Sequence, residues 1–139
     1  MQEIYYKLVT VVRSDLYSYR FFFKNLFDKY NIRYEVGNFV YPKVLGTKLY
    51  CFQSQKYALD YLDECSMNLQ FGGIKLFKCE CINPKTDEAN LSANLSEMMM
   101  DAFYNNIDLE YNNRVACPNG TIVCDGIKLL EEVSQDEIL

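Results

Sequence analysis

Short runs of aromatic and β-branched residues, separated by Gly and Pro, do most to limit the folds open to this 139-residue chain. The run from Ile4 to Val12, "IYYKLVTVV", alternates in hydrophobicity, and Gly46 to Gln53, "GTKLYCFQ", is a second compact run of the same kind. Such residues suit a pleated, half-buried surface, and alternation with a period of two indicates a strand. Twelve Tyr and nine Phe, with no Trp, strengthen the preference for sheet.

Further strands are expected beside turn signals. "FGGIKLFKCECI" follows a Gly-Gly turn and stops before a proline, while "TIVC" and "IKLL" lie on either side of Asp125-Gly126. "IRYEVGNFVYP" predicts a short strand that ends at Gly37. The segment from Asp15 to Tyr30 fits a helix or a strand. We favour a strand to about Phe22 followed by a loop, and the helical alternative stays open.

Two helices are expected to cover this sheet. "SQKYALDYLDEC" has Ser54 placed as the N-cap, and one helical face then carries Tyr57, Ala58, Tyr61, Leu62 and Cys65. "NLSEMMMDAFY" has Asn94 in the capping position, with Glu97 three residues later. The elements together predict an α+β fold, a mostly antiparallel sheet of six or seven strands with one or two covering helices. We expect a single domain over residues 1–139, with 134–139 as a frayed tail.

The net charge of −5 is divided unevenly along the chain. Residues 1–86 carry 12 Lys and Arg against 8 Asp and Glu, whereas residues 87–139 carry 2 against 11. An acidic chain is a poor general binder of nucleic acid, because that affinity comes from phosphates neutralised by Lys and Arg. With no signal peptide and no apolar run of membrane-spanning length, we expect a cytoplasmic protein with no membrane partner.

The chain contains no histidine. This excludes nucleophile pairs that use Ser-His or Cys-His, zinc proteases of the HExxH type, and the usual histidine base. Neither GxGxxG nor GxxxxGK[ST] occurs, so the common phosphate-binding loops are excluded as well. Paired carboxylates are sequence neighbours that point to different faces, so no catalytic residue and no cofactor is predicted.

Six cysteines are present, and in a cytoplasmic chain they are expected to be reduced. Cys79 and Cys81 form a C-x-C pair, and Cys117 and Cys124 form a C-x₆-C pair across a predicted turn. Four thiolates could form a zinc or redox site, although structural sites usually use C-x₂₋₄-C spacings. Since Cys79 and Cys81 share a strand face with Phe77, small buried core residues are the favoured interpretation, and no metal is predicted. Whether these four cysteines converge is left open by the sequence.

A set of aromatic and basic residues is the remaining candidate site. Aromatic rings stack on bases and Arg or Lys holds phosphates, so such a set suits a nucleotide-type ligand. An ordinary solvated sheet face has the same composition. The candidate ligand-binding residues are Tyr17, Arg20, Lys24, Arg33, Tyr34, Tyr41, Lys43 and Lys48.

The overall pattern resembles a family of small accessory proteins of phage and prophage genomes. The similarity is carried by "YYKLVTVV", "DLYSY", "YEVGN", "LYCFQSQKYALDYL", "IKLFKCECI" and "PNGTIVCDGIKLLEEV". It implies a non-enzymatic protein of the host cytoplasm that counters host defence by sequestering a nucleotide immune signal, often as a homo-oligomer. The family has no agreed activity, so the resemblance assigns no role to any residue.

Two other functions remain open. One is a protein-binding inhibitor of a host defence factor that uses its acidic C-terminal half, and the other is a nucleotide-processing enzyme with an unrecognised site. The order of strand, "CFQSQ", helix, strand and "RVACPNGTI" is also similar to ADP-ribosyltransferase-like domains. Those enzymes need an Arg or His at the start of the sheet and a Glu near its end. Without a histidine, and with "QSQ" at the strand end, such a fold would be degenerate and non-catalytic.

Overall fold

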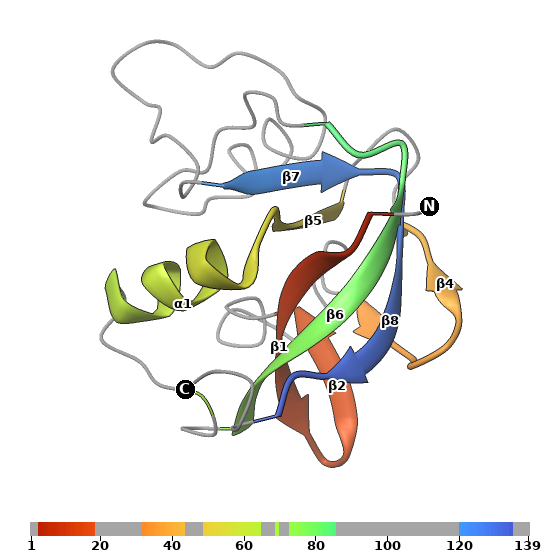
Figure 1. Cartoon of the computed structure of the whole chain (residues 1–139). Coiled ribbons are helices and arrows are strands. Elements are labelled where there is room, and N and C mark those ends of the chain that lie inside the picture. The colour runs from red at the N-terminus through yellow and green to blue at the C-terminus, as the bar shows by residue number, and fades with distance from the viewer. Residues whose placement is uncertain are drawn as a thin grey trace, which may run out of the picture.

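The computed structural model describes residues 3–18, 32–43, 49–64, 69, 73–85 and 120–134. Within these ranges the chain forms eight strands and one helix, and every strand pair is antiparallel (Figure 1). The predicted α+β class with a sheet-dominated core is therefore confirmed. The elements are β1 (Tyr5–Val12), β2 (Asp15–Ser18), β3 (Arg33–Tyr34), β4 (Phe39–Val40), β5 (Leu49–Phe52), α1 (Gln55–Glu64), β6 (Ile74–Ile82), β7 (Thr121–Cys124) and β8 (Gly126–Glu132).

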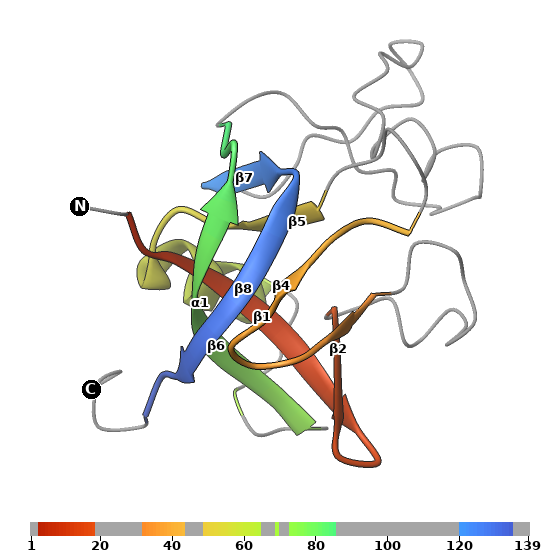
Figure 2. The same ribbon diagram turned by 90° about the vertical axis from the view of Figure 1, so that its right-hand side faces the viewer.

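The strands β1, β6 and β8 form the long central ladders, within the order β3-β2-β1-β6-β8-β4. Although β3 and β4 lie at opposite ends of this order, only residues 35–38 separate them in the chain. The sheet must therefore curl, and Figure 2 shows the segment of β3 and β4 passing from the β2 side to the β8 side. The Gly37 amide fixes this crossing by donating to the Leu129 carbonyl at 2.9 Å.

A second set of pairings closes a ring at one end of the curled sheet. The strand β5 pairs with β1 through Tyr6 and Phe52, and with β7 along its whole length. Beyond the end of β6, Lys85 and Val123 exchange two backbone hydrogen bonds of 2.8 and 2.9 Å, which ties this segment to β7. The order β1-β5-β7-β6 thus returns to β1. Side chains that alternate to the inner face of these four strands are enclosed together.

Two apolar clusters lie on the two faces of β1 and β6. The inner cluster contains Val9, Phe77 and Leu129 among others, whereas the outer cluster contains Leu8 and Leu76. The helix α1 covers the outer cluster with Ala58 and Leu62, both buried. In Figure 1 this helix lies on one side of β1, and β4 lies on the other. The inner cluster therefore lies inside the curl of the sheet.

Most of the element predictions can be compared with this structure. The strands expected over "IYYKLVTVV", "GTKLYCFQ", "FGGIKLFKCECI", "TIVC" and "IKLL" are confirmed as β1, β5, β6, β7 and β8. The first helix is confirmed, and the Tyr57 amide donates to the Ser54 hydroxyl at 3.3 Å, as expected of an N-cap. The start of the ambiguous segment is the strand β2. The rest of that segment, the second helix and residues 135–139 lie outside the described residues. Within the described ranges, no helix has the length and apolar character needed to cross a membrane.

Candidate functional site

Four cysteines converge inside the ring of β1, β5, β6 and β7. The Sγ atoms of Cys51, Cys81 and Cys124 all lie within 4.8 Å of one another, and the Sγ atoms of Cys51 and Cys81 are 3.3 Å apart. Cys79 lies beside them and accepts hydrogen bonds from Cys51 and Cys81. All four are free thiols; Cys81 is partly exposed and the other three are buried. This cluster, with Lys7, is the thiol site described below.

Strand alternation explains why these sulfurs point inward. Cys79 and Cys81 are two residues apart on β6, so they share the face of Phe77, as the sequence predicted. On β5 and β7 the register sets Cys51 opposite Ile122 and Leu49 opposite Cys124, so all four of these side chains face inward together. The two strands that carry Cys51 and Cys79 flank β1, and the thiols meet over its inner face.

Lys7 is the one charged side chain that is buried in the described part of the chain, with an exposed fraction of 1%. It lies on the inner face of β1, and its Nζ donates to the Tyr50 carbonyl at 2.7 Å. The same Nζ lies 3.9 Å from the centre of the Tyr50 ring and 5.4 Å from that of Tyr34. Burial lowers the pKa of Lys7 to about 8, and the negative charge of nearby thiolates opposes this change. A positive charge is therefore held inside the ring beside the four sulfurs.

The thiols of the site differ in acidity because they are hydrogen-bonded to one another. Donation from Cys51 and Cys81 lowers the pKa of Cys79 to about 5, against the effect of burial. Burial raises the pKa of Cys51 well above its usual range. The hydrogen bond with Cys51 lowers the pKa of Cys124, but that with Cys81, together with burial, outweighs it and raises the value. These shifts favour negative charge on the Cys79 sulfur over the sulfurs of Cys51 and Cys124.

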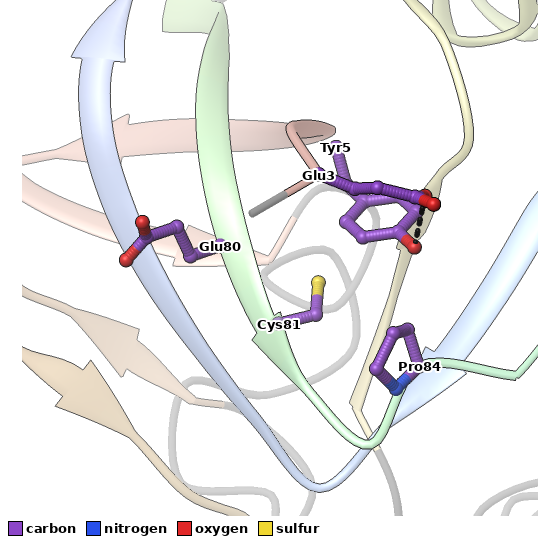
Figure 3. Close-up of a pocket in the computed structure, with 5 residues that line it drawn as sticks. All are labelled: Glu3, Tyr5, Glu80, Cys81 and Pro84. Carbon is purple, nitrogen blue, oxygen red and sulfur yellow. Dashed lines mark hydrogen bonds between the residues drawn. The ribbon is translucent and has the colours of Figure 1, made fainter. Parts of the chain in front are cut away.

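An open pocket of about 240 Å³ lies directly outside the thiol site. It is lined by Glu3, Tyr5, Glu80, Cys81 and Pro84 (Figure 3). The Tyr5 hydroxyl donates to Glu3 at 2.7 Å, and this bond, with burial, raises the pKa of Tyr5 to about 12. Figure 3 shows the Cys81 sulfur on the same side of β6 as the Tyr5 ring, whereas Glu80 points away from it. Cys81 therefore belongs both to the thiol site and to the pocket wall.

The predicted aromatic and basic set is only partly brought together. Tyr17 and Arg33 lie opposite each other in the ladder of β2 and β3, and Arg33 is 3.8 Å from the carboxylate of Asp15. Tyr34 points to the other face, where it is 3% exposed and belongs to the inner cluster. Tyr41 is 54% exposed beyond β4, next to Phe39.

The other members of this set add no further contact among the described residues. Lys43 is exposed at the end of the same segment as Tyr41. Arg20, Lys24 and Lys48 lie outside the described residues. Among the described residues, the members of the predicted set that lie opposite each other are therefore Tyr17 and Arg33.

Sequence reasoning did not find two members of the thiol site, Cys51 and Lys7. The sequence offered Cys117 as a possible neighbour of Cys124 and left open whether they converge; Cys117 lies outside the described residues, and the observed neighbours of Cys124 are Cys51 and Cys81. The available signal was the period of two in each strand: Cys51 shares the face of Leu49 in β5, and Lys7 shares the face of Tyr5 and Val9 in β1. That signal gives the face of each strand but not which strands pair.

No protein-family model, curated protein or solved structure significantly matches this chain.

Proposed function

We propose that this protein binds a thiophilic divalent cation, with Zn²⁺ the best fit, through Cys51, Cys81 and Cys124. The observation that carries the proposal is the convergence of these three sulfurs within 4.8 Å. Tetrahedral Zn²⁺ with Zn–S bonds of about 2.3 Å places its sulfur ligands about 3.8 Å apart. The separation of 3.3 Å between Cys51 and Cys81 and the 4.8 Å limit for the set lie on either side of that value. Small side-chain adjustments are therefore enough to enclose the ion.

Charge balance favours a divalent over a monovalent cation. Three thiolates and the Lys7 ammonium carry a net charge of −2, which a divalent ion reduces to zero and a monovalent ion only to −1. A buried net charge is costly, so the neutral combination is preferred. Cys79, which is hydrogen-bonded to Cys51 and Cys81, is not one of the three sulfurs within 4.8 Å of one another, and it would have to move closer to add a fourth sulfur. As a fourth thiolate it leaves the divalent site at −1, still one unit closer to neutrality than the monovalent site.

The direct test is a titration of the reduced, metal-free protein with Zn²⁺ and with Co²⁺. We expect one equivalent of Zn²⁺ to bind, and Co²⁺ to give the intense near-ultraviolet absorption of cobalt–thiolate bonds. Changes to residues that merely support ligands cost about 10–100-fold in affinity, so loss of a ligand in Cys124→Ser should cost about 100-fold or more. The expected loss is similar for Cys51→Ser.

Ile122→Val is the matched control for these variants. It lies on the same strand and the same face as Cys124 and is equally buried, but it removes no sulfur. It should keep wild-type affinity while losing about 1 kcal/mol of stability. Absence of the cobalt–thiolate absorption from the folded wild-type protein would refute the proposal.

A second candidate function, suggested by the resemblance to phage accessory proteins, is sequestration of a small nucleotide-type ligand. The observation that favours it is the cross-strand pair of Tyr17 and Arg33, which sets a ring beside a guanidinium near the protein surface. Such a pair can stack on a base and hold a phosphate. Thermal melting with a panel of cyclic and ADP-ribose-derived nucleotides tests this. We expect a nucleotide to raise the melting temperature of the wild-type protein and of the control Lys56→Ala, whose side chain is exposed on α1, but not that of Arg33→Ala. If no nucleotide in the panel changes the melting temperature of the wild-type protein, this function is refuted.

A further inference from the structure

We infer that the thiol site is also an oxidation switch, in which a hydroperoxide converts Cys81 and Cys51 to a disulfide and so expels the cation. Release of the cation rests on the proposed function, whereas formation of the disulfide does not. The inference stands on the separation of the two sulfurs, on their unequal exposure, and on the pocket that reaches only one of them.

The two sulfurs are already in contact. Their separation of 3.3 Å must shorten by about 1.3 Å to reach the disulfide bond length of about 2.05 Å. Cys51 and Cys81 are on β5 and β6, which flank β1, so the bond would cross the inside of the ring. Both are members of the three-sulfur set that would hold the cation.

Exposure sets the order of the reaction. Cys81 is partly exposed and lines the pocket, whereas Cys51 is 0% exposed and Cys124 is 1% exposed. Oxidation of a cysteine requires access as well as thiolate character. A small hydroperoxide that enters the pocket therefore meets the Cys81 sulfur first. Cys51 is reached only from inside the site, where Cys81 is its neighbour.

The chemistry is a two-electron oxidation in two steps. The Cys81 thiol loses its proton and its sulfur attacks one peroxide oxygen. The O–O bond breaks, and the leaving alkoxide takes up that proton to become an alcohol, or water when the oxidant is hydrogen peroxide. Cys81 is now a sulfenic acid. The Cys51 sulfur then attacks the Cys81 sulfur, the S–O bond breaks, and the hydroxide leaves as water with the proton of the Cys51 thiol. Overall, one hydroperoxide and two thiols give one disulfide, one alcohol and one water.

The disulfide removes two of the three converging ligands. Only Cys124 and Cys79 keep thiol sulfurs, and two ligands do not complete the tetrahedral sulfur site that Zn²⁺ requires. Lys7, still buried, would then repel the ion with fewer thiolates to offset its charge. Oxidation therefore lowers affinity by removing ligands and by changing the balance of charge.

The test treats the metal-free and the Zn²⁺-saturated protein with a small excess of hydrogen peroxide. Mass spectrometry of proteolytic peptides locates the disulfide, because cleavage after Glu80 places Cys79 and Cys81 on different fragments. A chromophoric chelator records the release of Zn²⁺, and dithiothreitol should restore binding. We expect a disulfide between Cys51 and Cys81 in the metal-free protein, and one equivalent of Zn²⁺ released as it forms in the saturated protein.

Variants separate the two steps. Cys51→Ser should accumulate a sulfenic acid on Cys81 that dimedone traps, and Cys81→Ser should leave Cys51 reduced. Cys124→Ser, which loses the cation, should still form the disulfide.

If a variant does not fold, the peptide map of the wild-type protein is sufficient to test the switch. A disulfide between any other pair, or none, overturns the switch whether or not Zn²⁺ binds. The Cys51–Cys81 disulfide in a protein that never binds Zn²⁺ leaves the oxidation intact and overturns the proposed function instead.

Discussion

At the scale of single residues, Lys7 is the most unusual feature of this protein. A buried ammonium loses its hydration, and among the described residues Lys7 regains one hydrogen bond, to the Tyr50 carbonyl. The rings of Tyr50 and Tyr34 add cation–π attraction. A fully apolar side chain of similar length would avoid this desolvation. Lys7 is therefore better explained by the sulfurs that it faces than by the stability of the fold.

We expect Lys7→Met to stabilise the metal-free protein while weakening its cation binding. Burial lowers the pKa of Lys7 from 10.5 to about 8, so between these values the unfolded chain binds more protons than the folded one. The unfavourable contribution is thus fully present below about pH 8 and disappears as the pH rises from about 8 to 10.5. At pH 7 the variant should be more stable by about 1–3 kcal/mol.

Urea unfolding of both proteins between pH 7 and 10.5 checks this prediction. The advantage of Lys7→Met should shrink across the upper part of that range. Comparing the two proteins largely cancels the titration of the thiols and tyrosines that face Lys7, since both proteins contain them. Zn²⁺ titration at pH 7 should show weaker binding by the variant. A destabilised variant with unchanged affinity would show that Lys7 serves the fold and not the site.

At the scale of elements, the position of α1 depends on the turn that begins β7. Gly120 has a φ of +78°, and a Cβ added there would lie 2.2 Å from Cγ of Tyr57, in the first turn of α1. The Gln53 amide also donates to the Gly120 carbonyl at 2.8 Å, just before the helix. Glycine at this position therefore meets two needs, a left-handed backbone and close approach of the helix.

Gly120→Ala should destabilise the protein by about 3 kcal/mol or more, the sum of backbone strain and steric overlap. Gly37→Ala is the matched control, because Gly37 has a φ of +90° with nothing within 4 Å of an added Cβ. That variant should lose only about 1–2 kcal/mol from the strain of the left-handed backbone. Chemical unfolding measures both. Equal losses at the two glycines would show that Tyr57 does not pack on the turn.

Local patterns predicted the elements, but not the pairings between them. The alternation in Ile4 to Val12 and the N-cap at Ser54 are properties of neighbouring residues, and both are confirmed. The shared face of Cys79 and Cys81 has the same local origin. By contrast, the meeting of Cys51 with Cys81 depends on β5 and β6 flanking β1, and on the ring closed by Lys85. Such contacts between distant segments leave no period in the sequence.

Register is a second feature that local patterns do not determine. A bulge between Lys78 and Cys79 shifts the pairing of β6 with β8, so that Lys78 faces Glu131 and Glu80 faces Lys128. Ion pairs of 3.4 and 3.1 Å accompany these two pairings. Because their side chains are partly exposed, they contribute little to stability. The two ion pairs instead favour this register of β6 and β8 over registers shifted by one residue, and this register places Cys79 and Cys81 on the inner face.

At the scale of the whole molecule, binding of the cation should be visible as stability. A ligand that binds only the folded state adds about 2.7 kcal/mol at 100 times its dissociation constant. For a domain of this size, that corresponds to a rise in melting temperature of roughly 5–10 °C. Calorimetry of the reduced protein with and without Zn²⁺ measures the rise. A strong chelator should reverse it, and Cys124→Ser should show none; a rise that persists in this variant would place the ion elsewhere.

The closed ring of β1, β5, β7 and β6 also has a consequence for folding kinetics. Its sulfurs come from segments far apart in sequence: Cys51 and Cys81 are 30 residues apart, and Cys124 follows 43 residues later. Contacts of such high sequence separation form late, because the entropy of closing each loop must be overcome first. A cation that needs all three sulfurs can join only after the transition state. The cation should therefore leave the refolding rate nearly unchanged and lower the unfolding rate, so that it stabilises the native state kinetically.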